Sequence, residues 1–269
     1  MTFKAIARSL LPPIVADLAA RHRDPAWSGD YPSWAEALAD SSGYDSPVIL
    51  ERVAAAALKV RHGEAVHERD GVVFEAIEYS WPLLAGLLWV AAREGGRLDV
   101  LDFGGALGST YAQNRHFLAP LAALRWSVVE QPHFVARGRS EFQDERLRFY
   151  ESVEACLAEN RPNVLVLSSV LQYLERPYEL LEGLDRFPFA VVDLTPVHGG
   201  HDDRLTVQEV PPGIYPARYP CWIFSEARLI AALQRSARVV AAFDAYLGHD
   251  LSVAGLKARY RGYILERGR

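Results

Sequence analysis

The pattern of apolar and polar positions changes near residue 96. Before that residue, apolar side chains recur at helical spacing, and the segments begin at residues that commonly start helices. The helices expected there are Lys4–Leu11, Pro13–Arg21, one that begins at Trp34 after Ser33, one from Pro47 to His62 after Ser46, and one from Ser80 and Pro82 to Gly95-Gly96. We therefore expect residues 1–95 to form a helical N-terminal cap region.

From Arg97 onward, short apolar runs alternate with helical patterns. The strands expected are Arg97–Asp102, Arg125–Glu130, Leu147–Tyr150, Asn163–Leu167, Phe189–Leu194, Arg238–Phe243 and Tyr260–Glu266. The helices expected are Ser109–Leu118, Pro132–Phe142, Val153–Ala158, Ser169–Leu184 and Ser225–Gln234. Continuous apolar strands are typical of a parallel sheet that is buried on both faces. We therefore expect residues 96–269 to form an α/β domain, with the last two strands as an antiparallel pair at one edge.

Composition and charge narrow the class of protein. Of the 269 residues, 50% are hydrophobic and 23% charged, which is usual for a globular protein. The formal net charge is −5, so we expect no nucleic-acid partner. The run from Trp81 to Ala92 is too short to span a bilayer, and we expect no membrane partner. Cys156 and Cys221 fit neither a metal site nor a disulfide framework, which favours the cytoplasm. The sequence does not determine the oligomeric state.

A glycine-rich turn follows the first strand of the α/β region. Asp102 ends the strand, and Gly104, Gly105 and Gly108 precede the expected helix at Ser109. Such a turn brings backbone amides close to a nucleotide. The next strand ends at Glu130, whose carboxylate can accept both hydroxyls of a ribose. The two signals predict an adenosine-containing ligand. An ordinary turn is the structural alternative, and NAD is less favoured because the last glycine of the dinucleotide pattern is missing.

These segments resemble the class I S-adenosylmethionine-dependent methyltransferases. Residues 102–108 are similar to their first motif, with Ala106 where many members have glycine, and Glu130 matches their second acidic position. Ser168–Leu174 resembles the segment that contacts the methionine half of the cofactor. The resemblance implies a Rossmann-like, seven-stranded, mostly parallel sheet. More narrowly, the chain from Trp34 to Phe243 is similar to a bacterial methyltransferase family that also includes enzymes cyclising S-adenosylmethionine to azetidine-2-carboxylate. The segments that carry this similarity are Trp81–Leu84, Asp102–Ser109, Trp126–Gln131, Ser168–Leu174 and Val210–Trp222.

The resemblance implies S-adenosylmethionine as the cofactor and a set of residues that contact it. The expected contacts are Asp102, Gly104, Gly105, Ala106, Gly108 and Ser109 at the turn, Glu130 and Gln131 at the ribose and adenine, Glu151 and Ser152 at the adenine amino group, and Ser168, Ser169 and Gln172 at the methionine ammonium or carboxylate. The serines have a structural alternative, because Ser152, Ser168 and Ser169 are also typical helix caps.

Two reactions remain open at this stage, both on a small molecule. One is methyl transfer to an oxygen or nitrogen acceptor, and the other is cyclisation of S-adenosylmethionine with release of methylthioadenosine. A sulfonium is attracted to aromatic faces by about 0.5–2 kcal/mol. The candidate catalytic residues are Tyr79, Tyr111, Asn114 and Tyr173. A non-catalytic binding domain is a third hypothesis, favoured by Ala106. The segment His198–Asp203 is interpreted as a lid over the substrate rather than a metal site, and no metal is expected.

Overall fold

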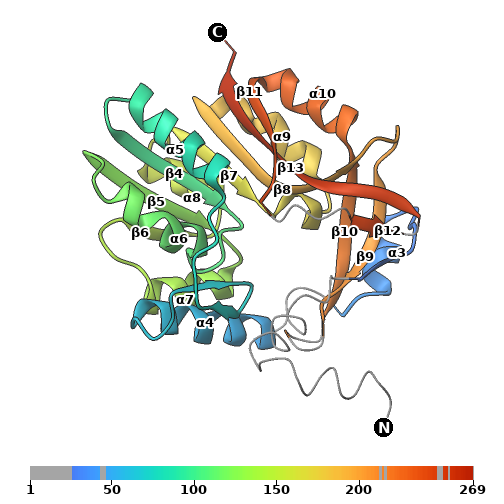
Figure 1. Cartoon of the computed structure of the whole chain (residues 1–269), viewed down its shortest axis with the longest axis horizontal. Coiled ribbons are helices and arrows are strands. Elements are labelled where there is room, and N and C mark those ends of the chain that lie inside the picture. Colours follow the sequence, from blue (N-terminus) through green and yellow to red (C-terminus); the bar gives the residue numbers. More distant parts are fainter. Residues whose placement is uncertain are drawn as a thin grey trace, which may run out of the picture.

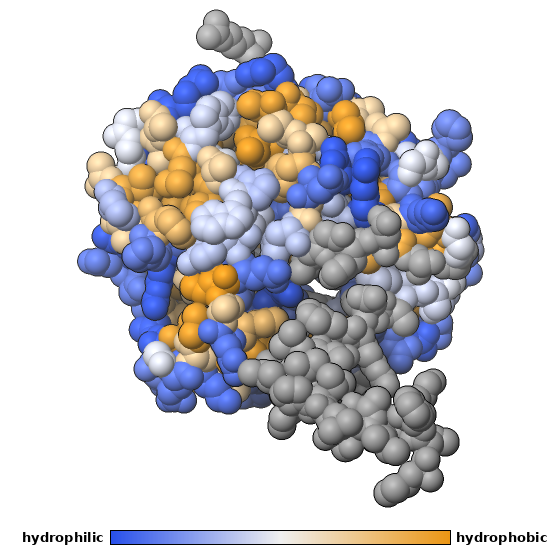
Figure 2. All heavy atoms as spheres, viewed as in Figure 1, coloured by the Kyte–Doolittle hydropathy of each residue, from blue (hydrophilic) through white to orange (hydrophobic). Residues whose placement is uncertain are grey.

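The computed structural model describes residues 26–42, 47–211, 214, 217–246, 251–253 and 255–268. Its main feature is a mixed sheet of eleven strands, with helices packed on it (Figure 1). The predicted helices Lys4–Leu11 and Pro13–Arg21, and the predicted cap Ser46, lie outside the described residues. On the face shown in Figure 2, hydrophilic and hydrophobic residues are interspersed.

A parallel core forms the centre of this sheet. Its strands are β4 (Arg97–Phe103), β5 (Ala123–Val129), β6 (Leu147–Tyr150), β7 (Val164–Ser168) and the first half of β8 (Phe189–His198), in the order β6-β5-β4-β7-β8. Strand β13 (Leu256–Arg267) pairs antiparallel with β8, and β11 (Ala237–Asp244) pairs antiparallel with β13. The predicted α/β fold and its antiparallel edge pair are therefore confirmed.

Helices cover both faces of the core because the strands carry apolar side chains on both faces. The helices α5 (Trp81–Arg93), α6 (Ser109–Leu118) and α7 (Pro132–Glu141) bury one hydrophobic cluster. The helices α8 (Val153–Glu159) and α10 (Glu226–Ser236) bury the other. Ser152 caps α8 by accepting a 3.1 Å hydrogen bond from the Ala155 N–H. Among the described residues, no helix has the length and apolar character needed to span a membrane.

The single helix expected over Ser169–Leu184 is not formed. A 3-10 turn covers Leu171–Tyr173, α9 covers Pro177–Glu182, and a second 3-10 turn covers Gly183–Arg186. The prediction was wrong because Pro177 disfavours helical backbone in the preceding residue, and Ser169 adopts a left-handed φ of 55°. The apolar side chains of this segment instead pack against β8 and α10.

The N-terminal region holds strands as well as helices. Helices α3 (Trp34–Ala39) and α4 (Pro47–Arg61) occur where the sequence predicted them. Between α4 and α5, β2 (His67–Arg69) and β3 (Val72–Phe74) form a hairpin. Its two turn residues, Asp70 and Gly71, have φ values of 52° and 74°, which are typical of a type I′ turn. The division of the chain at residue 95 remains a prediction.

Strand β8 continues beyond the parallel core into a second group of strands. Its last residues, Val197 and His198, pair in parallel with β10 (Arg218–Ser225). Antiparallel pairing then adds β9 (Arg204–Glu209) and β1 (Ala26–Ser28). The short β12 (Leu251–Val253) joins through β13. We call β1, β9, β10 and β12 the side lobe, which lies to the right of the core in Figure 1.

Candidate active site

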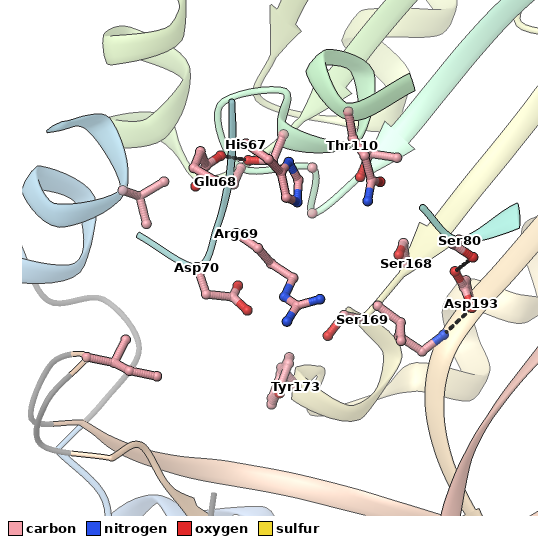
Figure 3. Close-up of a pocket in the computed structure, with 18 of the residues that line it drawn as sticks. His67, Glu68, Arg69, Asp70, Ser80, Thr110, Ser168, Ser169, Tyr173 and Asp193 are labelled. Atoms are coloured by element: carbon pink, nitrogen blue, oxygen red, sulfur yellow. Dashed lines mark hydrogen bonds between the residues drawn. The ribbon is translucent and has the colours of Figure 1, made fainter. Parts of the chain in front are cut away.

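A cavity of about 220 Å³ opens at the carboxyl ends of β4, β7 and β8. Residues 104–106, which belong to the glycine bend (residues 104–108), form one wall. The β2–β3 hairpin lies beside the bend, where Glu68 is bonded to Ser109, and its charged side chains extend into the cavity (Figure 3), while the side lobe forms the far wall. Parallel α/β sheets bind ligands at this end of the strands.

The glycine bend has no room for side chains at two of its positions. A methyl group on Gly104, whose φ is 73°, would lie 2.4 Å from Cγ2 of Val170. A methyl group on Gly105 would lie 2.5 Å from Oδ2 of Asp102. The Asp102 carboxylate is buried, accepts a 2.9 Å hydrogen bond from Trp126 Nε1, and has its pKa raised to about 7 by burial. Asp102 therefore packs against the side of the bend that faces the protein interior, and the backbone of the bend faces the cavity.

Glu130 is directed at this bend from the neighbouring strand. Its carboxylate accepts a 2.7 Å hydrogen bond from the Gln131 N–H and a hydrogen bond from the Ala106 N–H. Burial raises the pKa of Glu130, and these two backbone donors oppose that rise. The acidic side chain and the glycine-rich backbone are thus in direct contact, although they are separated by a helix in the sequence.

The end of β7 supplies hydroxyl groups to the cavity. Ser168 and Ser169 line it, together with Tyr173, whose hydroxyl donates to Gln208 Oε1 at 2.9 Å. Gln172 is buried behind them and donates to Ser169 Oγ at 3.2 Å and to the Leu194 carbonyl at 3.3 Å. Gln172 therefore positions the wall of the cavity and does not form it.

Left-handed backbone is concentrated around this cavity. Within the part of the chain that the structure describes, four residues other than glycine have positive φ: Asp70, Ala106, Ser169 and Leu194, at 52°, 49°, 55° and 51°. All four line the cavity. Such conformations cost free energy and cluster at functional sites. The φ of Ala106 also explains why glycine is the easier residue at that position of the motif.

The acidic groups at the other side of the cavity were not predicted from the sequence. Asp193 on β8 is buried and accepts hydrogen bonds from Ser80 Oγ at 2.7 Å and from the Leu194 N–H at 2.8 Å. Burial raises its pKa to about 6. Ser80, expected as a helix cap, makes no capping bond with its side chain. The available signal was an aspartate within the apolar run Val191–Leu194, because a buried acid in a strand requires partners.

The hairpin brings three charged residues to the cavity. Glu68 accepts a hydrogen bond from the Ser109 hydroxyl, and burial raises its pKa to about 7. Arg69 and Asp70 follow it and also line the cavity. Burial and the Arg69 charge lower the pKa of His67 to about 4, so this imidazole is neutral at pH 7. The Asp70-Gly71 dipeptide is a recognised hairpin signal and could have revealed this element.

Neither Glu130 nor Gln131 lines this cavity, and the remaining candidate residues also lie outside it. Tyr79 packs in an aromatic cluster with Trp81 and Phe117. Asn114 is fully buried and donates to the Thr110 carbonyl at 2.9 Å. Tyr111 and Gly108 line a second cavity beneath α4 and α6, and Tyr111 also packs on Trp126. Glu151 is exposed, and Ser152 caps α8.

The segment 198–203 is held in place beside α9 and α10. Asp203 accepts hydrogen bonds from the Tyr178 hydroxyl at 2.9 Å and the Ser225 N–H at 2.8 Å. Ser225 Oγ donates to the Gly200 carbonyl at 2.7 Å. None of residues 198–203 lines the cavity, so the structure does not support the expected lid. Among the described residues, no group of three metal-binding side chains occurs.

Comparison with known proteins shows the fold. No protein-family model and no curated protein matches the sequence. The N-terminal domain of EvdMO1, crystallised in the presence of SAH and D-fucose, is 15% identical, with 79% of this chain and 96% of that chain covered and a TM-score of 0.50. The glycopeptide N-methyltransferase MtfA, complexed with S-adenosyl-L-homocysteine, is 13% identical, with 72% and 93% covered and a TM-score of 0.44. A S-adenosylmethionine-dependent methyltransferase from Clostridium acetobutylicum is 8% identical, with 71% and 93% covered and a TM-score of 0.44.

The strand order and the likeness to the EvdMO1 domain together define the class of fold. The core order β6-β5-β4-β7-β8 with the antiparallel pair β13 and β11 is the sheet expected from the sequence resemblance. The chain therefore has the fold of the class I S-adenosylmethionine-dependent methyltransferases.

Proposed function

We propose that this chain is an enzyme that binds S-adenosylmethionine between the glycine bend and Glu130. The observation that carries the proposal is the contact of the Glu130 carboxylate with the Ala106 N–H. This contact supports a ribose acceptor beside the bend, whose backbone lines the cavity because side chains at Gly104 and Gly105 would clash with Val170 and Asp102. When bound, S-adenosylmethionine supplies a methyl group activated by positively charged sulfur. Ser109, Ser168 and Ser169 are suited to hold its methionine half because they line the adjoining cavity.

We favour methyl transfer to a small molecule because the cavity extends beyond the glycine bend. Its far side is lined by Gln208, Val210, Ile214 and Tyr219 of the side lobe and the segment that follows β9. The part of the cavity between this far side and the glycine bend is available to a second substrate beside the cofactor. The chain's part in such a reaction is to align the acceptor and exclude water.

Asp193 is suited to accept the proton that an oxygen or nitrogen acceptor loses. Its pKa of about 6 leaves it mostly ionised at pH 7 while still basic enough to take a proton. Asp193→Asn should lower kcat about 100-fold and leave the Kd for S-adenosylmethionine within about twofold. The wild-type rate should rise as pH increases through about 6, because Asp193 then loses its proton. The matched control is Asp202→Asn, on an exposed loop. An unchanged kcat in Asp193→Asn would remove this role.

Cyclisation of S-adenosylmethionine is the second candidate, because hydroxyl groups that can orient its amine line the cavity. These groups belong to Ser168, Ser169 and Tyr173. Incubation of the purified protein with S-adenosylmethionine alone, followed by mass spectrometry, separates the two reactions. A methyltransferase forms S-adenosylhomocysteine only after an acceptor is added. A cyclase forms methylthioadenosine and azetidine-2-carboxylate without one. Calorimetry that detects no binding of S-adenosylmethionine would refute both.

A further inference from the structure

Arg69 places a guanidinium in the cavity without an acidic partner in contact. Its Nη1 donates to the Tyr246 hydroxyl at 2.6 Å. Its Cζ lies 5.3 Å from the centre of the Phe74 ring and 5.6 Å from that of Tyr246. Throughout the described part of the chain, no carboxylate forms an ion pair with Arg69, and Asp70 and Glu78 act on it only at longer range. The guanidinium is therefore held in position while most of its donors remain available.

Asp70 presents the opposite charge to the same space. It occupies the left-handed turn position of the hairpin, and its side chain is open to the cavity. Figure 3 shows the Asp70 and Arg69 side chains extending into the cavity towards Ser169 and Tyr173. The surrounding protein raises the pKa of Asp70, and the Arg69 charge opposes that rise. The hairpin thus offers one cationic and one anionic group, side by side but not paired with each other.

Such a pair of charges matches a zwitterion. A guanidinium binds a carboxylate with two parallel hydrogen bonds, and a carboxylate binds an ammonium by charge-assisted hydrogen bonds. We propose that the β2–β3 hairpin binds the α-amino acid group of a ligand, with the ligand carboxylate on Arg69 and its ammonium at Asp70. The group belongs either to the methionine half of S-adenosylmethionine or to an amino acid that accepts the methyl group, and in both cases the inference rests on the proposed function.

Calorimetry with two nucleosides tests the first source. S-adenosylmethionine carries the amino acid group, and methylthioadenosine has the same nucleoside without it. If the cofactor is the source, Arg69→Gln and Asp70→Asn each weaken S-adenosylmethionine binding at least about tenfold and leave methylthioadenosine within about twofold. The matched control is Arg93→Gln, which removes an exposed guanidinium paired with Glu266. Arg69→Lys keeps the charge without the planar geometry and should lose part of the affinity. Arg69→Lys also takes the place of Arg69→Gln in this comparison if the glutamine variant does not fold.

Thermal shifts with free L-amino acids test the second source, with and without S-adenosylhomocysteine. If the acceptor is the source, at least one amino acid stabilises the wild type more than its amino alcohol does, and Arg69→Gln abolishes the difference. Failure of the proposed function has a different signature, because the wild type then binds neither nucleoside while the amino acid arm is still measured. The inference is overturned if Arg69→Gln and Asp70→Asn match the wild type in both arms, or if no amino acid group improves binding to the wild type.

Discussion

The walls of the cavity are built in two different ways. The glycine bend offers backbone, because Val170 and Asp102 leave no room for side chains at Gly104 and Gly105. The other walls offer side chains from the β2–β3 hairpin, β8 and the side lobe, among them Arg69, Asp70 and Asp193. Backbone geometry serves any ligand that carries the same nucleoside, whereas charged side chains select one ligand among many. Under the proposed function, the glycine bend selects the cofactor and the charged side chains select the reaction.

The largest effect on affinity is expected at the glycine bend. Gly105→Ala places a methyl group 2.5 Å from Oδ2 of Asp102, which is buried and bonded to Trp126. Because Asp102 cannot move aside, we expect the bend to shift and binding of S-adenosylmethionine to weaken about 100-fold or more, as measured by calorimetry. The control is Gly199→Ala, because nothing lies within 4 Å of the added methyl group. Equal affinity in the two variants would show that the bend does not contact the cofactor.

The buried acidic side chains around the cavity should reduce the stability of the folded protein at neutral pH. Burial raises the pKa of Glu68 from 4.5 to about 7, so the folded protein holds this proton more tightly than the unfolded chain does. The free energy of unfolding therefore falls as pH rises through this window, by at most about 3 kcal/mol from this group. Asp102 and Asp193 contribute with the same sign, since burial also raises their pKa values.

The variant Glu68→Gln tests this, because it removes the proton equilibrium and keeps an acceptor for Ser109. Denaturant unfolding at about pH 5 and about pH 8 should show a smaller loss of stability in the variant than in the wild type. Parallel pH profiles for the two proteins would contradict the assignment of the raised pKa to Glu68.

A smaller effect on affinity is expected at Glu130, whose side chain contacts the glycine bend. Glu130→Ala should weaken S-adenosylmethionine binding at least about tenfold, the loss of one charge-assisted hydrogen-bonding site. Glu151→Ala is its counterpart at the end of β6, the next strand, and should change the affinity less than about twofold because Glu151 is exposed, whereas Glu130 is bonded to the bend. A larger loss at Glu151 than at Glu130 would mean that the nucleoside lies across β6 and not over the bend.

The same division explains what the sequence reveals. The parallel core could be predicted because strands such as β7 are apolar throughout, and the bend because glycine and a strand-end acid have fixed structural roles. The hairpin was missed because β2 and β3 have three residues each, too few for a periodic pattern. The bond between Ser80 and Asp193 joins residues 113 positions apart, and no local pattern predicts such a contact.

The most direct test of the account is a crystal structure of the full chain with S-adenosylhomocysteine. We predict that the nucleoside lies over residues 104–108, with the ribose hydroxyls hydrogen-bonded to the Glu130 carboxylate. A nucleoside bound elsewhere, or a structure in which Glu130 is turned away from an unliganded glycine bend at saturating ligand, would contradict the central claim.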